Sequence, residues 1–139
     1  MIIIDTDVFS ALVRSDTVDK VRAWLDGEPS GSVWTTSVTV LEVRFGLATM
    51  AVGRRRSTLK AEIDATLKDD LHGRIIPFDA AAAEETAMLM ADRQKRGRRI
   101  ELRDSMIAGI AIACRATLAT RNTGHFADLP IPVVNPWLD

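Results

Sequence analysis

Three carboxylates and one carboxamide stand at points of this sequence from which they could act together. Asp5 directly follows a run of isoleucines, and Glu42 lies within a predicted helix that follows a second short apolar segment. Asp104 lies in the first turn of a predicted helix after a basic loop, and Asn122 follows another apolar segment by two residues. If these segments are strands of one open parallel sheet, their carboxyl ends share the edge where such sheets bind ligands. We therefore expect the four side chains to converge there.

Side chains of this kind bind hard metal ions through oxygen. Three carboxylates at close range repel one another, and a divalent cation removes that repulsion; Mg²⁺ prefers oxygen ligands together with retained water. One cysteine and two histidines are too few for a structural zinc site. The sequence predicts a Mg²⁺ site, with Mn²⁺ as a substitute ion, formed by Asp5, Glu42, Asp104 and Asn122. Such sites commonly act on phosphates, because the ion activates water and neutralises phosphoryl oxygens.

Ordinary structural roles are also open to these residues. Asp7 could cap a helix over residues 8–14, and Asp5 could serve as a cap or turn residue, because an aspartate at a helix start accepts backbone N–H groups. Asp104 would complement the positive end of its helix dipole. Asn122 begins an Asn-Thr-Gly sequence that is typical of a turn. Taken singly, each residue fits either interpretation.

Glu42 is expected on an apolar face of its helix. The other members of that face are Val38, Leu41, Phe45 and either Leu47 or Ala48. A carboxylate on a buried face must be hydrogen-bonded, paired with a cation or bound to a metal. Arg103 or Arg121 could provide a simple ion pair, which is the alternative to metal binding.

A basic run precedes and overlaps the start of the helix that carries Asp104. Its members are Arg93, Lys95, Arg96, Arg98, Arg99 and Arg103, interrupted by Glu101. We expect Arg98, Arg99 and Arg103 to contact the phosphates of a substrate beside Asp104. The alternative is a solvated helix end, whose cations complement the helix dipole.

The elements needed to hold these residues alternate along the chain. Short β-branched or apolar runs predict strands at residues 2–4, 33–35, 74–77 and 117–120, with a short edge strand within 131–134. Helical periodicity and capping residues predict helices at 8–14, from 15 to about 26, from 37 to about 52, and at 54–71, 80–96 and 103–116. This alternation predicts an α/β protein with a parallel sheet covered by helices.

Composition limits the possible functions. The 139 residues suit one domain, 1–139, and 18 basic against 19 acidic residues give a net charge of −1. A chain without strong net charge does not coat nucleic acid or an anionic membrane nonspecifically. The single Cys114, which we expect in the core, suits a reducing cytoplasm. No apolar run approaches the roughly 20 residues of a membrane span, so we expect no membrane association.

Four segments resemble, in order, the motifs of PIN domains. They are IIIDTDV at 2–8, TSVTVLEVRFG at 36–46, DSMIA at 104–108 and ATRNTGHF at 119–126. Their spacing and the Asn-Pro-Trp sequence at 135–137 resemble the VapC toxins, especially the FitB-like subgroup. The resemblance implies a three-layer α/β/α fold with a central, mainly parallel sheet of four or five strands. It also implies a metal-dependent ribonuclease toxin, its RNA substrate, a homodimer, and a cognate DNA-binding antitoxin of VapB or FitA type.

The resemblance also implies roles for particular residues. Asp5, Glu42 and Asp104 fill three acidic sites of the family, and the fourth acidic site falls on Asn122. Asn122 departs from the family in charge but still offers an oxygen. Asp7 stands where the family often has Asn, which adds negative charge nearby.

Two other functions remain open at this point. Asp5-Thr6-Asp7-Val8 after an apolar strand also resembles the nucleophile segment of haloacid-dehalogenase-like phosphatases. The chain is short for that family, and no lysine stands near the later acidic site. The other alternative is a non-catalytic protein that binds an antitoxin-like partner, for which Asn122 is the sole support.

Overall fold

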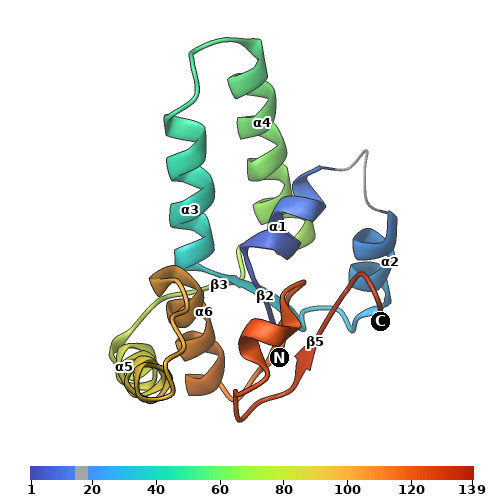
Figure 1. Cartoon of the computed structure of the whole chain (residues 1–139). Coiled ribbons are helices and arrows are strands. Elements are labelled where there is room, and N and C mark those ends of the chain that lie inside the picture. Colours follow the sequence, from blue (N-terminus) through green and yellow to red (C-terminus); the bar gives the residue numbers. More distant parts are fainter. Residues whose placement is uncertain (15–18) are drawn as a thin grey trace.

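The centre of the molecule is a parallel sheet of five strands in the order β3-β2-β1-β4-β5. The computed structural model describes residues 1–14 and 19–139 (Figure 1). The strands are β1 (Ile2–Ile4), β2 (Val33–Thr36), β3 (Ile75–Ile76), β4 (Thr117–Ala119) and β5 (Val133–Val134). The predicted α/β fold and the predicted edge strand are therefore confirmed.

Strand β1 lies at the middle of the sheet and pairs in parallel with both β2 and β4. Ile2 is in register with Val33 on one side and with Thr117 on the other. The strand order reverses at β1, so the chain leaves the carboxyl ends of β1 and β4 toward different sides. In open parallel sheets this switch point forms the crevice in which ligands bind. Asp5 and the segment containing Asn122 follow these two strands.

Helices cover both faces of the sheet. They are α1 (Thr6–Val13), α2 (Asp19–Gly27), α3 (Ser37–Ala48), α4 (Arg54–Ala65), α5 (Ala80–Lys95) and α6 (Leu102–Ala113). A π-helical turn, η1 (Thr66–Asp70), continues α4, and a 3₁₀ helix, η2 (Thr123–Phe126), follows β4. None of the helices in the described part of the chain is long and apolar enough to cross a membrane.

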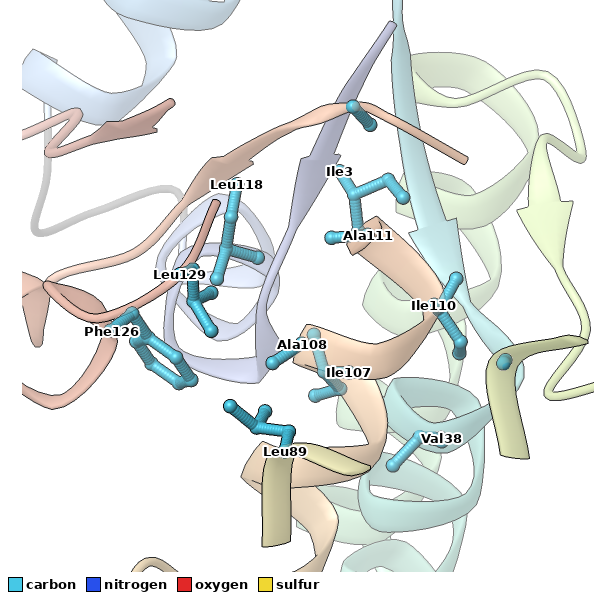
Figure 2. Close-up of a cluster of buried hydrophobic side chains, with 12 residues drawn as sticks. Ile3, Val38, Leu89, Ile107, Ala108, Ile110, Ala111, Leu118, Phe126 and Leu129 are labelled. Carbon is cyan, nitrogen blue, oxygen red and sulfur yellow. The ribbon is translucent and has the colours of Figure 1, made fainter. Parts of the chain in front are cut away.

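The two cores reflect the alternation of side chains along the strands. Ile3 and Leu118 face a core built with α5 and α6, which Figure 2 shows around Ile107 and Leu89. The neighbouring Ile4 faces the opposite core, which is built with α1, α2 and α4. Successive strand residues point to opposite faces, so these short strands build a three-layer α/β/α molecule.

Helices α5 and α6 pack unusually closely where they cross. A Cβ added to Gly109 of α6 would lie 1.8 Å from Oγ1 of Thr86 and 2.8 Å from the carbonyl oxygen of Ala82. Thr86 in turn donates a hydrogen bond to that carbonyl, at 2.7 Å. Gly109 therefore sets the separation of the two helices.

Several details differ from the expectations. Asp5, not Asp7, caps α1, because the helix begins at Thr6. Helix α6 ends at Ala113, which leaves Cys114 exposed at its C-cap and not in the core. The regular α-helix expected over residues 54–71 ends at Ala65 and continues as the π-helical turn. The expected start of the second helix, at Ser15-Asp16, lies outside the described residues.

The expected apolar face of α3 was wrong at two of its positions. Leu41 and Phe45 are 59% and 62% exposed, whereas Thr39 and Leu47 are buried with Val38. The reason is that α3 pairs with α4 in a hairpin that projects from the sheet (Figure 1). Contacts with α1 and α4 therefore bury a face of α3 rotated from the one that hydrophobicity indicated.

Candidate active site

Asp5 lies at the carboxyl end of β1, and its side chain is bound on both oxygens. Oδ1 accepts a hydrogen bond from the backbone N–H of Val8, at 3.0 Å, and Oδ2 accepts one from the hydroxyl of Thr120, at 2.5 Å. Asp5 is 5% exposed. Burial, followed by the negative charges of Asp7 and Asp104, raises its pKa to about 6 against the opposing hydrogen bonds. Asp5 is thus a helix cap and also a carboxylate close to other acids.

Thr120 and Thr6 orient the acidic residues, and the sequence did not single out either. Thr120 is fully buried, and its Oγ1 also accepts the backbone N–H of Asn122, at 3.1 Å. This hydroxyl therefore links the ends of β1 and β4. Thr6 donates a hydrogen bond to Oε1 of Glu42, at 2.8 Å. Threonine is too common for either to be noticed alone, but both lie within the motif segments quoted above.

Glu42, in the second turn of α3, faces the site from a partly buried position. Its other carboxylate oxygen, Oε2, lies 3.8 Å from Nη1 of Arg103 on α6. This contact is one of the two ion pairs that the sequence left open. Arg121, the other candidate, instead places its guanidinium 4.9 Å from the centre of the Trp137 ring. Glu42 thus joins α1, α3 and α6 at the site.

Asp104 lies in the first turn of α6 and is partly buried. Burial raises its pKa, and the charges of Glu101, Glu42 and Asp7 act in the same direction, opposed by His125. The acids that influence Asp104 come from α1, α3 and the residue before α6. The carboxylates predicted from the sequence are therefore close enough to influence one another's ionisation.

Asn122 lies opposite Asp7 across the end of the sheet. Its Nδ2 donates a hydrogen bond to Oδ2 of Asp7, at 3.1 Å, and its backbone caps the 3₁₀ helix η2. The amide nitrogen is engaged by this contact, which leaves Oδ1 as the group able to bind a cation. The two departures from the family pattern, Asp7 and Asn122, are thus in direct contact.

The donor atoms suit a hard divalent cation in type. All are oxygens, from Asp5, Glu42, Asp104 and Asn122, and the pKa of Asp5 is raised mainly by burial, with a smaller contribution from the negative charges of Asp7 and Asp104. In the described part of the chain, however, no group of three or more Asp, Glu, His or Cys side chains is arranged to hold a metal ion. The structure brings the acids near one another. Asp5 accepts hydrogen bonds from a hydroxyl and a backbone N–H, and Glu42 is bound by a hydroxyl and lies close to the Arg103 guanidinium.

The basic run is divided between surface and core. Arg99 is exposed and makes no ion pair with the described residues, and Arg98 is 38% exposed in its side chain. Arg103 pairs with Glu101, at 2.8 Å, as well as with Glu42. Arg93 is 2% exposed, so its expected place in a solvated or phosphate-binding run was wrong. It faces inward because a buried carboxylate, Asp128, pairs with it.

A largely apolar groove begins beside the acidic residues. It has a volume of about 350 Å³ and runs between α1, α3 and α4. Thr6 and Glu42 line one end, and Val43, Leu47 and Leu59 line its walls. The groove leads directly to the carboxylate of Glu42.

The PIN domain family model matches residues 2–131. The chain belongs to the PIN domain family. This PIN domain is 36% identical over 137 residues to the VapC ribonuclease Y4jK of Sinorhizobium fredii, covering 99% of this chain and 98% of that protein. It is 34% identical to toxin FitB of Neisseria gonorrhoeae over the full length of both chains.

Solved structures agree with this family membership. The crystal structure of FitAcB from Neisseria gonorrhoeae includes a chain that is 34% identical to this PIN domain. It superposes with a TM-score of 0.86 and covers 99% of each chain. A structure of FitAB bound to a DNA fragment gives the same TM-score and identity, covering 99% of this chain and 96% of that one. The predicted three-layer fold is confirmed by this similarity.

Proposed function

We propose that this protein is a metal-dependent endoribonuclease and the toxin of a toxin–antitoxin pair, acting as one PIN domain over residues 1–139 in the cytoplasm. The observation that carries the proposal is the gathering of Asp5, Glu42 and Asp104 at the switch point of a PIN fold. A full-length relative named as a ribonuclease supports the reaction class. The phosphatase alternative loses support, because its resemblance was confined to one short segment.

Asp5, Glu42 and Asp104 are the residues that would hold Mg²⁺ or Mn²⁺, with the Oδ1 of Asn122 assisting. When bound, such an ion neutralises phosphoryl charge and lowers the pKa of water so that it can attack phosphorus. Thr120 and Thr6 fix the orientation of Asp5 and Glu42 through their hydroxyl groups. Arg103 balances part of the charge of Glu42.

The arginines beside α6 would bind the RNA backbone. Arg99 and Arg98 are accessible to solvent. Arg103 lies in the first turn of α6, beside Glu42. Arginine binds phosphate with a planar fork of donors, which suits a backbone contact. The chain has no tyrosine, three tryptophans and four phenylalanines, so extended base stacking is not the expected mode of RNA binding.

The groove between α1, α3 and α4 supports an antitoxin as partner. Its apolar walls would bind an amphipathic segment, and its end at Glu42 would accept a basic side chain from that segment. The FitAB structure bound to DNA provides the precedent for a complex that also contacts DNA. A guanidinium bound at Glu42 would compete with a metal ion for the same carboxylate and inhibit the enzyme.

The test is cleavage of RNA by the purified, antitoxin-free protein. We expect cleavage with Mg²⁺ or Mn²⁺, and none after both ions are removed with EDTA. Activity that persists in metal-free buffer would contradict the mechanism. A phosphatase would instead release phosphate from phosphomonoesters and form an acid-stable aspartyl-phosphate. Binding of the co-expressed antitoxin without any RNA cleavage would identify a non-catalytic interaction protein.

A further inference from the structure

Arg93 is the bulkiest of the described side chains that are fully buried, although it carries a permanent charge. It extends from the last turn of α5 and pairs with Asp128 through two contacts. Nε lies 3.1 Å from Oδ2, and Nη2 lies 3.1 Å from Oδ1. The guanidinium holds the pKa of Asp128 below its usual range. Asp128 is itself 7% exposed in its side chain, so both charges of the pair are removed from water.

The remaining donors of Arg93 reach two segments that carry candidate site residues. Nη1 donates to Oγ of Ser105, at 3.3 Å, and Ser105 directly follows Asp104 in the first turn of α6. Nη2 donates to the backbone carbonyl of His125, at 2.9 Å, within the 3₁₀ helix that Asn122 caps. One side chain therefore joins three segments: α5, the start of α6, and the chain that follows β4.

Stability alone does not account for a buried ion pair of this kind. Removing two charges from water costs several kcal/mol per ion, and apolar side chains of similar volume often stabilise a core equally well. The guanidinium differs from an apolar side chain because its planar fork of donors fixes the relative positions of the groups that it binds. Here those groups lie next to Asp104 and close to Asn122.

We propose that Arg93 is a positioning residue for the candidate active site. It sets the first turn of α6 against the segment after β4, so that Asp104 and Asn122 face the end of β1. Arg93 contacts neither of these two residues, and it acts through Ser105, the His125 carbonyl and Asp128. This inference rests on the proposed ribonuclease function.

The test compares Arg93→Met with Arg22→Met, a control on α2 that has a similar pairing but a side chain that is 37% exposed. Arg22 also pairs with an aspartate through two contacts, to Asp70 at 2.6 and 3.1 Å, and also donates to a backbone carbonyl. None of these three contacts of Arg22 involves a candidate site residue. Both variants are expected to lose stability, so all activity is measured well below each melting temperature.

Three quantities separate positioning from stability: kcat and KM for RNA cleavage, and the Kd of Mn²⁺ from calorimetry. For Arg93→Met we expect kcat to fall and the Kd of Mn²⁺ to rise, each by about 10- to 100-fold, as for other residues that orient metal ligands. KM should change little, because Arg93 is buried away from RNA. Arg22→Met should keep the parent's kcat and Kd. A folded Arg93→Met protein with the parent's values would overturn the proposal.

A double variant, Arg93→Met with Asp128→Leu, applies if the single variant does not fold. Replacing the pair with apolar side chains should restore stability, yet the slow cleavage and weak Mn²⁺ binding should remain. If stability and both values return together, Arg93 is structural only. If neither Arg93 variant folds, Ser105→Ala is used instead, because it removes the hydroxyl to which Arg93 donates. A kcat and a Kd of Mn²⁺ equal to the parent's would then count against the proposal. An inactive parent protein would instead reject the ribonuclease function itself.

Discussion

Asp5 combines a structural role, as the cap of α1, with a proposed chemical role as a metal ligand. It closes the first turn of α1 and accepts the Thr120 hydroxyl, yet burial and neighbouring acids raise its pKa to about 6. Hydrogen bonds that favour the ionised form are thus outweighed by the loss of water and by negative charge. This balance predicts how the metal-free protein responds to pH.

The folded protein binds the Asp5 proton more tightly than the unfolded chain does, because its pKa rises from 3.8 to about 6. The resulting stabilisation is complete below pH 3.8 and is lost as pH rises through 6. The loss amounts to roughly 3 kcal/mol at neutral pH. The stability of Asp5→Asn relative to the parent should therefore increase as the pH is raised from 4 to 7.5, as measured by thermal unfolding in EDTA. An equal difference at both pH values would contradict the assigned shift.

A second prediction concerns the side chain of Asn122. Asn122→Asp would place a carboxylate against Asp7, at the position of the present 3.1 Å hydrogen bond. We expect this variant to be less stable than the parent without metal, and to bind Mg²⁺ more tightly because it adds a full charge. Asn122→Ala should weaken binding modestly, and Asp104→Asn should weaken it more.

Calorimetric titration with Mg²⁺, together with circular dichroism to confirm folding, tests this order. Parent-like affinity in both Asn122 variants would place Asn122 outside the metal site and leave it as a cap of η2.

Sequence reasoning identified the acidic residues but not their supporting contacts. Asp5 and Asn122 could be selected because each closely follows an apolar strand. Glu42 was selected from its predicted apolar helix face, and Asp104 from its place in the first turn of a helix that follows a basic loop. Thr6 and Thr120 could not be selected, because threonine occurs widely and its role depends on its partner. Arg93 was placed on the surface, because its partner Asp128 is 35 residues away and only tertiary packing brings them together.

At the scale of elements, the contact between α5 and α6 determines where the candidate site lies. Gly109 allows the two helices to approach, and α6 in turn carries Asp104. Gly109→Ala should destabilise the protein by about 1–3 kcal/mol, because overpacking displaces a well-packed core. Gly46→Ala is the matched control in α3, where the added Cβ would meet no side chain or neighbouring element within 4 Å.

Replacing that second glycine should be neutral or stabilise the protein by about 0.5–1 kcal/mol, through helix propensity. Chemical denaturation of both variants gives the comparison. Similar free energies of unfolding for Gly109→Ala and the parent would show that the helices can separate without loss.

Elements themselves could be predicted where the local pattern is strong. The isoleucine run predicts β1, and the helix predicted at 80–96 corresponds to α5, which Asp79 caps by accepting the N–H of Ala82. The orientation of α3 could not be predicted, because both of its faces carry apolar residues. Its partner helices decide which face is buried, and periodicity contains no information about those partners.

For the whole molecule, the exposed face of α3 bears on the homodimer that the family resemblance implies. Leu41 and Phe45 lie one turn apart and expose most of their apolar surface. Exposed apolar patches commonly mark protein interfaces. We predict that the parent sediments as a dimer, and that Leu41→Ser combined with Phe45→Ser shifts it toward monomer.

Val52→Ser serves as the control for this prediction, because Val52 is 90% exposed outside any helix. Analytical ultracentrifugation at several protein concentrations measures the equilibrium. A parent that remains monomeric at every concentration would show that there is no dimer. A double variant that dimerises like the parent would show that the dimer contact lies elsewhere.

The proposed cleavage of RNA depends on the acids that lie at the carboxyl edge of the sheet. Its most direct test is the single-turnover rate of RNA cleavage in Mg²⁺ for Asp5→Asn, Asp104→Asn and the exposed control Asp69→Asn. Each of the first two variants should lose about 100-fold or more in rate, equivalent to roughly 3 kcal/mol of barrier. Asp69→Asn should cleave at the parent's rate. Folded Asp5→Asn and Asp104→Asn proteins that cleave RNA as fast as the parent would contradict the account.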